Sequence, residues 1–353
     1  MQLYNKMSAE ERRILIKEAG EKRLTLSFYQ YHHIQNPKFF RDKLFLDWNA
    51  LGVLGRTYVA SEGINAQISV PAQRFEEFRK NLNEITFLKD IRLNVAIEQD
   101  DLSFLKLTIK IRPKIVADGL DDSSFDVTDC GVHVDAKTFN ELSEDPDTII
   151  LDMRNHYESE VGHFEGAVTP DVDTFRESLP IIEEELADCK EEKKLLMYCT
   201  GGIRCEKASA YFKHKGFKQV YQLEGGIIEY TRKAQELGLD NRFKGKNFVF
   251  DERKAERISD DVIAVCHQCG TACDEHINCA NAACHLLFIQ CPDCAKKFHQ
   301  TCSEECAHIV QLPEEEQAEL RKGKSAGKAQ FNKGRSDALR YKKPKDASIR
   351  ASL

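Results

Sequence analysis

The chain has 353 residues, too many for one ordinary hydrophobic core, so its length predicts two or three domains. Its hydrophobic share of 41% argues against general disorder, and its net charge of −7 is unlike that of a protein that binds nucleic acid over its whole surface. The first twenty residues lack the apolar core of a secretory signal, and every apolar run is far shorter than the roughly 20 residues that span a bilayer. We therefore expect a cytoplasmic protein with no membrane partner.

The first predicted domain is a small α+β unit over residues 23–115, preceded by a helical segment at 1–22. Its expected elements are a strand, a helix, two short strands around the Glu62-Gly63 turn, a second helix and two closing strands, at 23–34, 37–52, 56–70, 71–85, 91–98 and 105–111. The order β-α-β-β-α-β predicts a ferredoxin-like (acylphosphatase-like) fold. A linker rich in Asp, Ser and Gly follows at 116–132, and it contains Cys130, for which the sequence indicates no partner.

The last strand of this domain carries a row of positive charges. Alternate residues of a strand share a face, so a strand through this region would align Lys106, Lys110, Arg112 and Lys114. Such a row would neutralise phosphates of an RNA without reading its sequence. The alternative is an ordinary solvated face of a sheet.

The second predicted domain, 133–240, alternates strands with helices. Short apolar runs at 147–154, 195–199 and 219–223 are typical of strands buried in a parallel sheet. The stretch 204–216 between two of them is a predicted helix that ends at Gly216. This pattern predicts an α/β domain.

The segment "CTGGIRC", from Cys199 to Cys205, joins a strand to that helix. Ligands of α/β domains bind beyond the carboxyl ends of the strands, and Cys199 stands at such an end. Gly201 and Gly202 permit a tight turn, and the free N–H groups at the start of the helix would face an anion held in it. We therefore expect Cys199 to be a low-pKa nucleophile or to carry a persulfide, within a loop formed by Thr200, Gly201, Gly202, Ile203, Arg204 and Cys205.

The spacing within this loop separates two kinds of cysteine enzyme. A cysteine phosphatase places an arginine six residues after its cysteine, where the guanidinium forks onto phosphate oxygens. Here Arg204 is five residues on and Cys205 takes the sixth place. The loop therefore favours sulfur chemistry over phosphate chemistry, and Cys205 is either a helix-packing residue or a resolving thiol.

These motifs give the segment 133–240 a clear resemblance to a rhodanese domain. "LDMRNHYESEVGHFEGAV" matches the first hallmark of that family, "CTGGIR" matches its active loop, and "LEGGI" matches its closing motif. The resemblance implies that Cys199 forms the persulfide. Asp152 and Arg154 would support the site, either by pairing with each other or by hydrogen bonding to the loop.

A third predicted module, 241–310, is rich in cysteine. Nine of the thirteen cysteines lie between Cys266 and Cys306, and a cytosolic chain uses such clusters for metal rather than for disulfides. Two C-x2-C pairs predict one zinc site, formed by Cys266, Cys269, Cys291 and Cys294. A second quartet is Cys279, Cys284, Cys302 and Cys306, with Cys273, His285 and His299 as substitutes, and interleaved pairs would make a cross-braced module for two zinc ions. The alternative is a compact cap of reduced thiols.

The final segment, 311–353, is predicted to be a basic, disordered tail. From Arg321 to Arg350 it carries eleven Lys and Arg residues against two Asp, with Gly, Ser and Pro scattered through it. Alone it would neutralise phosphates without specificity.

The whole chain from about residue 20 to 310 resembles the bacterial rhodanese-family tRNA uridine hydroxylases. "ASEGIN", "YCTGGIRCEKAS", "GKNFVFDER" and "CHQCG" carry this resemblance. It implies oxygen-dependent 5-hydroxylation of the wobble uridine, with tRNA as partner, molecular oxygen as co-substrate and Cys199 as the essential residue. No nucleotide or flavin fingerprint is present, and the sequence predicts no oligomeric state. The alternatives are a plain sulfurtransferase that carries a persulfide on Cys199 and a non-catalytic redox or scaffold module.

Overall fold

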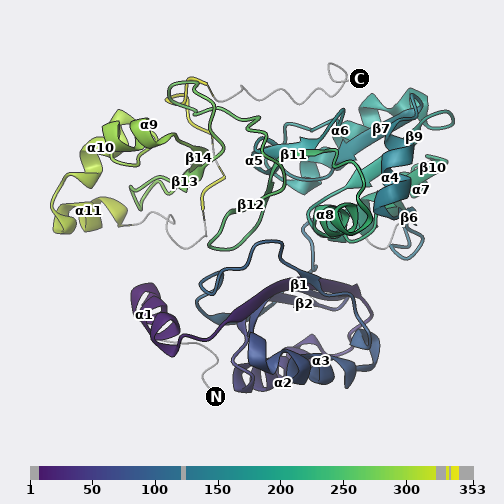
Figure 1. The fold of residues 1–353 in the computed structure, drawn as a ribbon, viewed down its shortest axis with the longest axis horizontal. Helices are drawn as coiled ribbons and strands as arrows, with labels where there is room; N and C mark the ends of the chain where they lie inside the picture. The colour runs from purple at the N-terminus through teal and green to yellow at the C-terminus, as the bar shows by residue number, and fades with distance from the viewer. Residues whose placement is uncertain (1–7, 121–124, 323–330, 334, 342–353) are drawn as a thin grey trace. The chain divides into compact units, whose positions relative to one another are not determined.

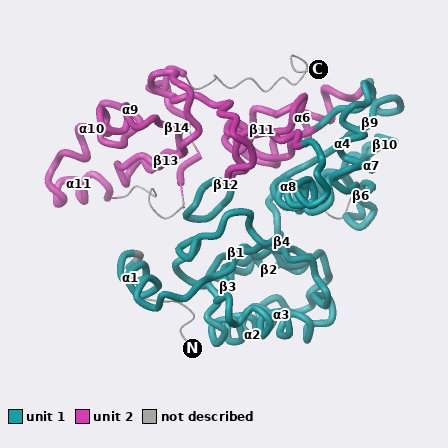
Figure 2. The backbone as a smooth tube through the Cα atoms, in the orientation of Figure 1, with its two compact units in different colours: residues 1–150, 188–240, 249–256 teal, residues 151–187, 241–248, 257–353 magenta. Residues whose placement is uncertain are grey.

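The computed structural model describes residues 8–120, 125–322, 331–333 and 335–341. The chain forms two compact units, which Figure 2 colours separately. Unit 1 comprises residues 1–150, 188–240 and 249–256, and unit 2 comprises 151–187, 241–248 and 257–353. The predicted α/β domain therefore contributes residues to both units. Within the described residues, no helix has both the length and the apolar character needed to cross a membrane.

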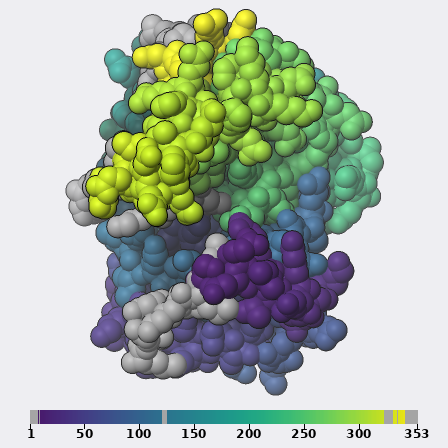
Figure 3. All heavy atoms as spheres, turned by 90° about the vertical axis from the view of Figure 1, so that its left-hand side faces the viewer, coloured from purple at the N-terminus to yellow at the C-terminus, as the bar shows by residue number. Residues whose placement is uncertain are grey.

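Unit 1 begins with the helix α1 (Ala9–Ala19), which lies on the surface of the molecule (Figure 3, dark purple). Ser8 and Glu11 form a reciprocal capping box at its first turn, and Gly20 ends it in the left-handed conformation. Ile14 and Leu15 remain exposed. The helix is thus held by its caps and by contacts such as Arg13 with Glu252, rather than by a buried apolar stripe.

The predicted ferredoxin-like fold is confirmed, and its two closing strands lie at opposite edges of the sheet. The sheet has the order β4-β1-β3-β2-β5, and its strands are β1 (Arg23–Tyr31), β2 (Leu54–Ala60), β3 (Gly63–Pro71), β4 (Asn94–Val95) and β5 (Leu107–Ile111). Neighbouring strands are antiparallel, except that β5 joins the edge of β2 in parallel. The strand expected at 91–98 is reduced to two residues.

Two helices, α2 (Pro37–Ala50) and α3 (Phe75–Asn83), cover one face of this sheet (Figure 1). Short 3-10 turns at Ala72–Arg74 and Thr86–Leu88 flank α3. Alternate side chains of β1 point to opposite faces of the sheet. Leu26 and Phe28 are buried in the core with Trp48 and Phe78, whereas Ser27, Tyr29 and Tyr31 lie on the opposite face.

The predicted parallel α/β sheet is also confirmed. Its order is β6-β10-β9-β7, with β6 (Val132–Val134), β7 (Thr148–Asp152), β9 (Lys194–Tyr198) and β10 (Gln219–Leu223). β10 pairs in parallel with both β6 and β9. The helices of unit 1 here are α4 (Ala136–Ser143), α7 (Ile203–His214) and α8 (Gly226–Leu237), and a 3-10 turn lies at Ala187–Cys189.

Unit 2 contains smaller elements. They include α5 (His156–Ser159), β8 (Gly162–Phe164) and α6 (Phe175–Glu185), and β8 pairs with β11 (Phe243–Phe248). The strand β12 (Ala255–Arg257), whose first two residues belong to unit 1, completes the sheet order β12-β11-β8. The cysteine-rich region supplies the hairpin β13 (His276–Asn278) and β14 (Leu287–Ile289), with α9 (Pro292–Lys297), α10 (Glu304–Val310) and α11 (Glu314–Arg321).

The structure differs from the prediction of a disordered tail over 311–353. Residues Glu314–Arg321 form α11, and described residues beyond it make specific contacts within unit 2. Arg335 pairs with Asp171 and Asp173, and Leu339 is buried beside Phe288. Although this segment is basic in composition, Arg335 forms ion pairs with two carboxylates and Leu339 packs into an apolar core, and these contacts anchor the segment. The rest of the predicted tail (323–330, 334 and 342–353) lies outside the described residues.

Candidate functional site

Cys199 follows β9 directly, at the carboxyl end of a central strand. The chain then turns through Gly202, whose φ of 100° is a left-handed conformation, and α7 begins at Ile203. The N–H of Gly202 donates a hydrogen bond to the Cys199 sulfur at 3.1 Å. The thiol is 1% exposed, so it lies at the bottom of a closed turn. This geometry matches the anion cradle expected from the sequence.

The two thiols of the loop have pKa values shifted in opposite directions. Burial acts to raise the pKa of Cys199, but a hydrogen bond from Cys205, the charge of Arg204 and backbone N–H groups outweigh it and lower the pKa to about 6. Burial and the neighbouring Cys199 thiolate raise the pKa of Cys205 well above its ordinary value. Cys199 is therefore largely thiolate at neutral pH, and Cys205 is a neutral donor to it.

The start of α8 holds the other side of the loop. The N–H groups of Ile227 and Ile228 donate to the carbonyls of Cys199 and Thr200, at 3.0 and 3.3 Å. Gly226 has a φ of 64°, and a Cβ there would lie 2.4 Å from the Cys199 carbonyl oxygen. Only glycine permits this approach. The motif "LEGGI" therefore has a physical role as well as a family resemblance: it lets α8 bind the backbone of the loop from Cys199 to Cys205, here called the reactive loop.

The N-terminal sheet supplies residues to the same loop, which the sequence analysis missed. The Tyr29 hydroxyl donates to Glu206 at 3.1 Å, and the Asn94 amide donates to the Gly201 carbonyl at 3.4 Å. A Cβ at Gly202 would lie 2.7 Å from the Tyr29 hydroxyl. Burial and the charge of Glu206 raise the pKa of Tyr29 well above its ordinary value, so it remains a donor. The sequence signal for these contacts was the alternation along β1, which places Tyr29 and Tyr31 on the face of the sheet opposite the core.

Lys207 lies on α7, the helix that follows Cys199 and is here called the reactive helix, and it connects this helix to two distant segments. Its ammonium lies 2.7 Å from Glu62 in the β2–β3 turn and 3.1 Å from Asp118 in the predicted linker. The Lys207 side chain is 1% exposed. Both carboxylates are needed because an isolated charge buried to this degree would be strongly destabilising. The motif "ASEGIN" thus provides a counter-ion for α7.

Asp152 and Arg154 pair with each other, which was one of the two alternatives. Arg154 donates to both oxygens of Asp152, at 2.6 Å from its Nη2 and 2.9 Å from its Nε. Nη2 also donates to the Gly162 carbonyl at 2.6 Å. Both side chains are fully buried in unit 2. Their contacts are those of a structural ion pair that fixes the turn before β8.

The row of positive charges near β5 is shorter than predicted. The strand ends at Ile111, so Arg112 and Lys114 lie beyond it. Lys106, Lys110 and Arg112 are exposed, and the Arg112 guanidinium lies 5.5 Å from the centre of the Tyr58 ring. Lys114 instead pairs with Asp118 at 2.7 Å. The backbone leaves the strand to reach the linker, which removes Lys114 from the row.

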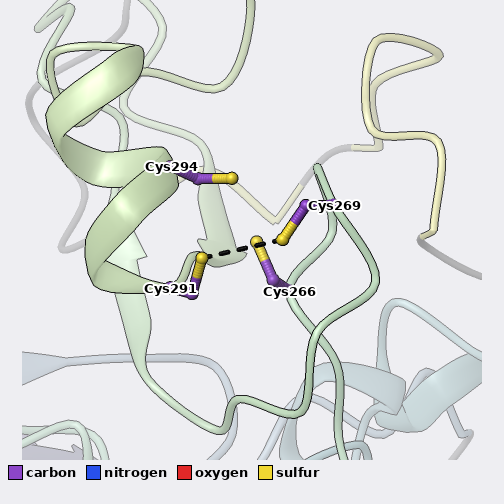
Figure 4. Close-up of side chains that lie close together, drawn as sticks. All are labelled: Cys266, Cys269, Cys291 and Cys294. Carbon is purple, nitrogen blue, oxygen red and sulfur yellow. Dashed lines mark hydrogen bonds between the residues drawn. The ribbon is translucent and has the colours of Figure 1, made fainter.

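The first cysteine quartet converges on one point in unit 2. Figure 4 shows the thiols of Cys266 and Cys269, from a loop, directed toward those of Cys291 and Cys294, at the start of α9. All four sulfur atoms lie within 4.8 Å of one another, and Cys269 is 3.6 Å from Cys291. Four thiolates around a common centre suit a tetrahedral ion such as zinc.

The second quartet, Cys279, Cys284, Cys302 and Cys306, meets the same criterion. The sulfur atoms of Cys284 and Cys302 are 3.6 Å apart, and the Asn281 amide donates to Cys306 at 3.3 Å. In sequence order the first and third pairs form one cluster and the second and fourth pairs form the other. This is the interleaved, cross-braced arrangement. Among the described residues, the substitutes Cys273, His285 and His299 belong to neither cluster.

Three family models match successive parts of the chain. They are described as the UPF0176 acylphosphatase like domain (residues 23–115), the Rhodanese-like domain (135–233) and Rhodanase C-terminal (244–307). Together these matches cover the N-terminal sheet, the reactive loop and both cysteine quartets.

Several proteins that are similar to this chain over most of its length are named tRNA uridine(34) hydroxylase. The protein of this name from Leptospira interrogans is 53% identical over 94% of this chain and 90% of its own length. That from Photorhabdus laumondii is 54% identical over 94% of this chain and 95% of its own, and that from Yersinia pestis is 56% identical over 94% of each.

Proposed function

Because the chain belongs to the tRNA uridine(34) hydroxylase family, we propose that it is a cytoplasmic tRNA-modifying enzyme that hydroxylates C5 of the wobble uridine with molecular oxygen. The observation that carries this proposal is the Cys199 thiolate, whose pKa is lowered to about 6 inside a cradle of N–H groups. A uracil ring is an electrophile at C6, and a thiolate is the nucleophile of this chain best prepared to add there.

The proposed step uses Cys199 to make C5 electron-rich. Addition of the thiolate to C6 forms an S–C6 bond and moves the ring electrons toward C5, which then reacts with oxygen. One oxygen atom remains as the 5-hydroxyl and the other leaves as water, so two electrons and two protons must come from an external reductant such as a dithiol. Loss of the C5 proton and of the Cys199 thiolate then restores the ring double bond.

The surface of the N-terminal sheet supports tRNA as the substrate. Lys106, Lys110 and Arg112 are exposed near one edge, and Tyr58, partly exposed, stands opposite Lys110 in the register of β2 and β5. Cations beside an aromatic ring are suited to a phosphate chain and its bases. On the same sheet, Tyr29 and Asn94 contact the reactive loop. We propose that this sheet helps to deliver the anticodon to Cys199.

The cysteine quartets are proposed to hold two zinc ions. Each offers four sulfur ligands and no open position, as in structural sites, so zinc here would stabilise the fold and take no part in oxidation. The cysteine-rich segment is too short to have much apolar core of its own, and six of the eight quartet cysteines are buried members of its two small core clusters.

The burial of Cys199 also favours the alternative, a rhodanese-type sulfurtransferase. A thiol that is 1% exposed meets an acceptor poorly, whereas a persulfide would place its outer sulfur about 2 Å further out. The same N–H groups that hold the thiolate would stabilise the persulfide anion. This activity predicts thiosulfate:cyanide transfer by the purified chain.

Mass spectrometry of tRNA nucleosides separates these activities. Cells that lack the protein are complemented with the wild type, Cys199→Ser or Cys189→Ser, since Cys189 is a half-buried thiol outside the loop. We expect Cys199→Ser to abolish 5-hydroxyuridine while the purified variant still binds tRNA, and Cys189→Ser to retain both. Continued modification by Cys199→Ser would end the proposal. Efficient sulfur transfer without an effect on 5-hydroxyuridine would establish the alternative.

A further inference from the structure

A third group of side chains of the types that bind metal ions lies in unit 1, and it shares no residue with the cysteine quartets. Its members are Cys130, just before β6, His133 in β6, and Glu206 in the first turn of α7. Their sulfur, nitrogen and oxygen atoms all lie within 4.8 Å of one another. Cys130 and His133 are close in the sequence, but Glu206, which completes the group, is distant in the chain, so the sequence did not indicate the group.

The donor set is chemically suited to a divalent transition metal ion. Thiolate, imidazole and carboxylate are the three ligand types that zinc uses in proteins. His133 Nε2 is 2.9 Å from Glu206 Oε1, so these atoms already face each other. The His133 side chain is 40% exposed, which gives an ion a route from solvent.

Neighbouring groups hold the carboxylate of Glu206 in place. Tyr29 donates to Oε1 at 3.1 Å, and Gln222 donates to Oε2 at 3.2 Å. The same Gln222 amide reaches the Gly131 carbonyl at 3.3 Å, between Cys130 and β6. Hydrogen bonds from outside the ligand set orient metal-binding carboxylates, and their loss weakens metal sites. The cluster therefore has neighbouring hydrogen-bond donors that fix its geometry, as well as three side chains that can act as ligands.

We propose that Cys130, His133 and Glu206 bind one zinc-like divalent ion and leave a coordination position open to solvent. Three protein ligands with an open position distinguish this site from the closed cysteine quartets. The ion would join the predicted linker, the edge strand β6 and the reactive helix α7. It would also fix Glu206, the partner of Tyr29, which packs against Gly202 in the Cys199 loop. Its role is positioning, and the proposal does not depend on the hydroxylation activity.

Zinc binding by the full-length chain tests this site. The purified wild type, His133→Gln, Cys130→Ser and the control Cys189→Ser are titrated with zinc against a chromophoric chelator, and bound zinc is counted by elemental analysis. We expect the wild type and Cys189→Ser to bind one more zinc per chain than His133→Gln and Cys130→Ser. The affinity of the additional site should fall by more than about 10-fold in both variants.

The difference between variants remains interpretable whatever the quartets bind. If neither quartet took zinc, the wild type would still exceed His133→Gln by one ion. Because His133 lies on an edge strand and is exposed, His133→Gln should fold, and circular dichroism of both variants verifies this. Equal zinc counts and affinities in the wild type and His133→Gln would overturn the proposal and leave only a His133–Glu206 ion pair.

Discussion

The ammonium of Lys207 lies 2.7 Å from the carboxylate of Glu62, although 145 positions separate them in the chain. Lys207 belongs to the helix that follows the Cys199 loop, and Glu62 belongs to a turn of the N-terminal sheet. Asp118 completes the buried group. The reactive helix and the N-terminal sheet are thus bound through charges that neither could bury alone.

Replacing Lys207 by Met should strongly destabilise the chain. The substitution leaves the carboxylates of Glu62 and Asp118 without their cation, and removing one partner of a buried pair costs about 3–5 kcal/mol. Lys213→Met on the same helix is the matched control, because its pair with Asp129 is partly exposed and should contribute at most about 1 kcal/mol. Urea unfolding measures both. Equal losses in the free energy of unfolding in the two variants would show that the burial of Lys207 adds nothing to the stability of the chain.

Gly226→Ala should disturb the reactive loop more than Gly238→Ala. Both glycines are at the ends of α8 with φ near 60°, so each substitution should cost about 1–2 kcal/mol in backbone strain. Only at position 226 would the new Cβ meet the Cys199 carbonyl, which should add about 1–3 kcal/mol. Thermal unfolding and 5-hydroxyuridine formation are the measurements. A Gly226→Ala variant as stable and active as Gly238→Ala would contradict this account.

The reactivity of Cys199 should depend on pH with a midpoint near 6. Because its pKa is lowered from 9.0 to about 6, the thiolate forms as the pH rises through 6 and the reaction rate then levels off above about pH 7. Arg204→Gln removes a positive charge and should move the midpoint to higher pH. Arg79→Gln, an exposed residue on α3, is the control. Peptide-resolved alkylation by mass spectrometry gives each profile, and a midpoint near 9 in the wild type would refute the shift.

Charge reversal at Lys110 should weaken tRNA binding in a salt-dependent manner. If Lys110 neutralises one phosphate, Lys110→Glu should reduce the slope of log affinity against log salt by about 1. Lys137→Glu, on the exposed surface of α4, serves as the control. Filter binding of tRNA at several salt concentrations provides the slopes. An unchanged slope in Lys110→Glu would remove this strand from the tRNA-binding surface.

Much of the reactive loop could be predicted from the sequence because its signals are local. Cys199 follows an apolar run, two glycines permit the turn, and the helix begins within four residues of it. The cysteine pairs are equally local, since C-x2-C spacing directs two sulfurs to one ion. The shortening of the strand expected at 91–98 to the two residues of β4 and the ordered residues around Arg335 were not predicted, because both depend on partners far away in the chain.

By itself, the sequence of this protein determined the two fold classes, the position of Cys199 at a strand end and the cysteines available for metal. The periodicity of apolar residues and the spacing of cysteines are patterns over a few residues, so they can be recognised without a structure. Tertiary structure alone decided that Tyr29 meets Glu206 across 177 positions, that Gly226 admits the backbone of the Cys199 loop, and that Cys130 and His133 meet Glu206. These relations arise from how separate elements pack, and packing depends on the burial of charge and volume rather than on any local pattern.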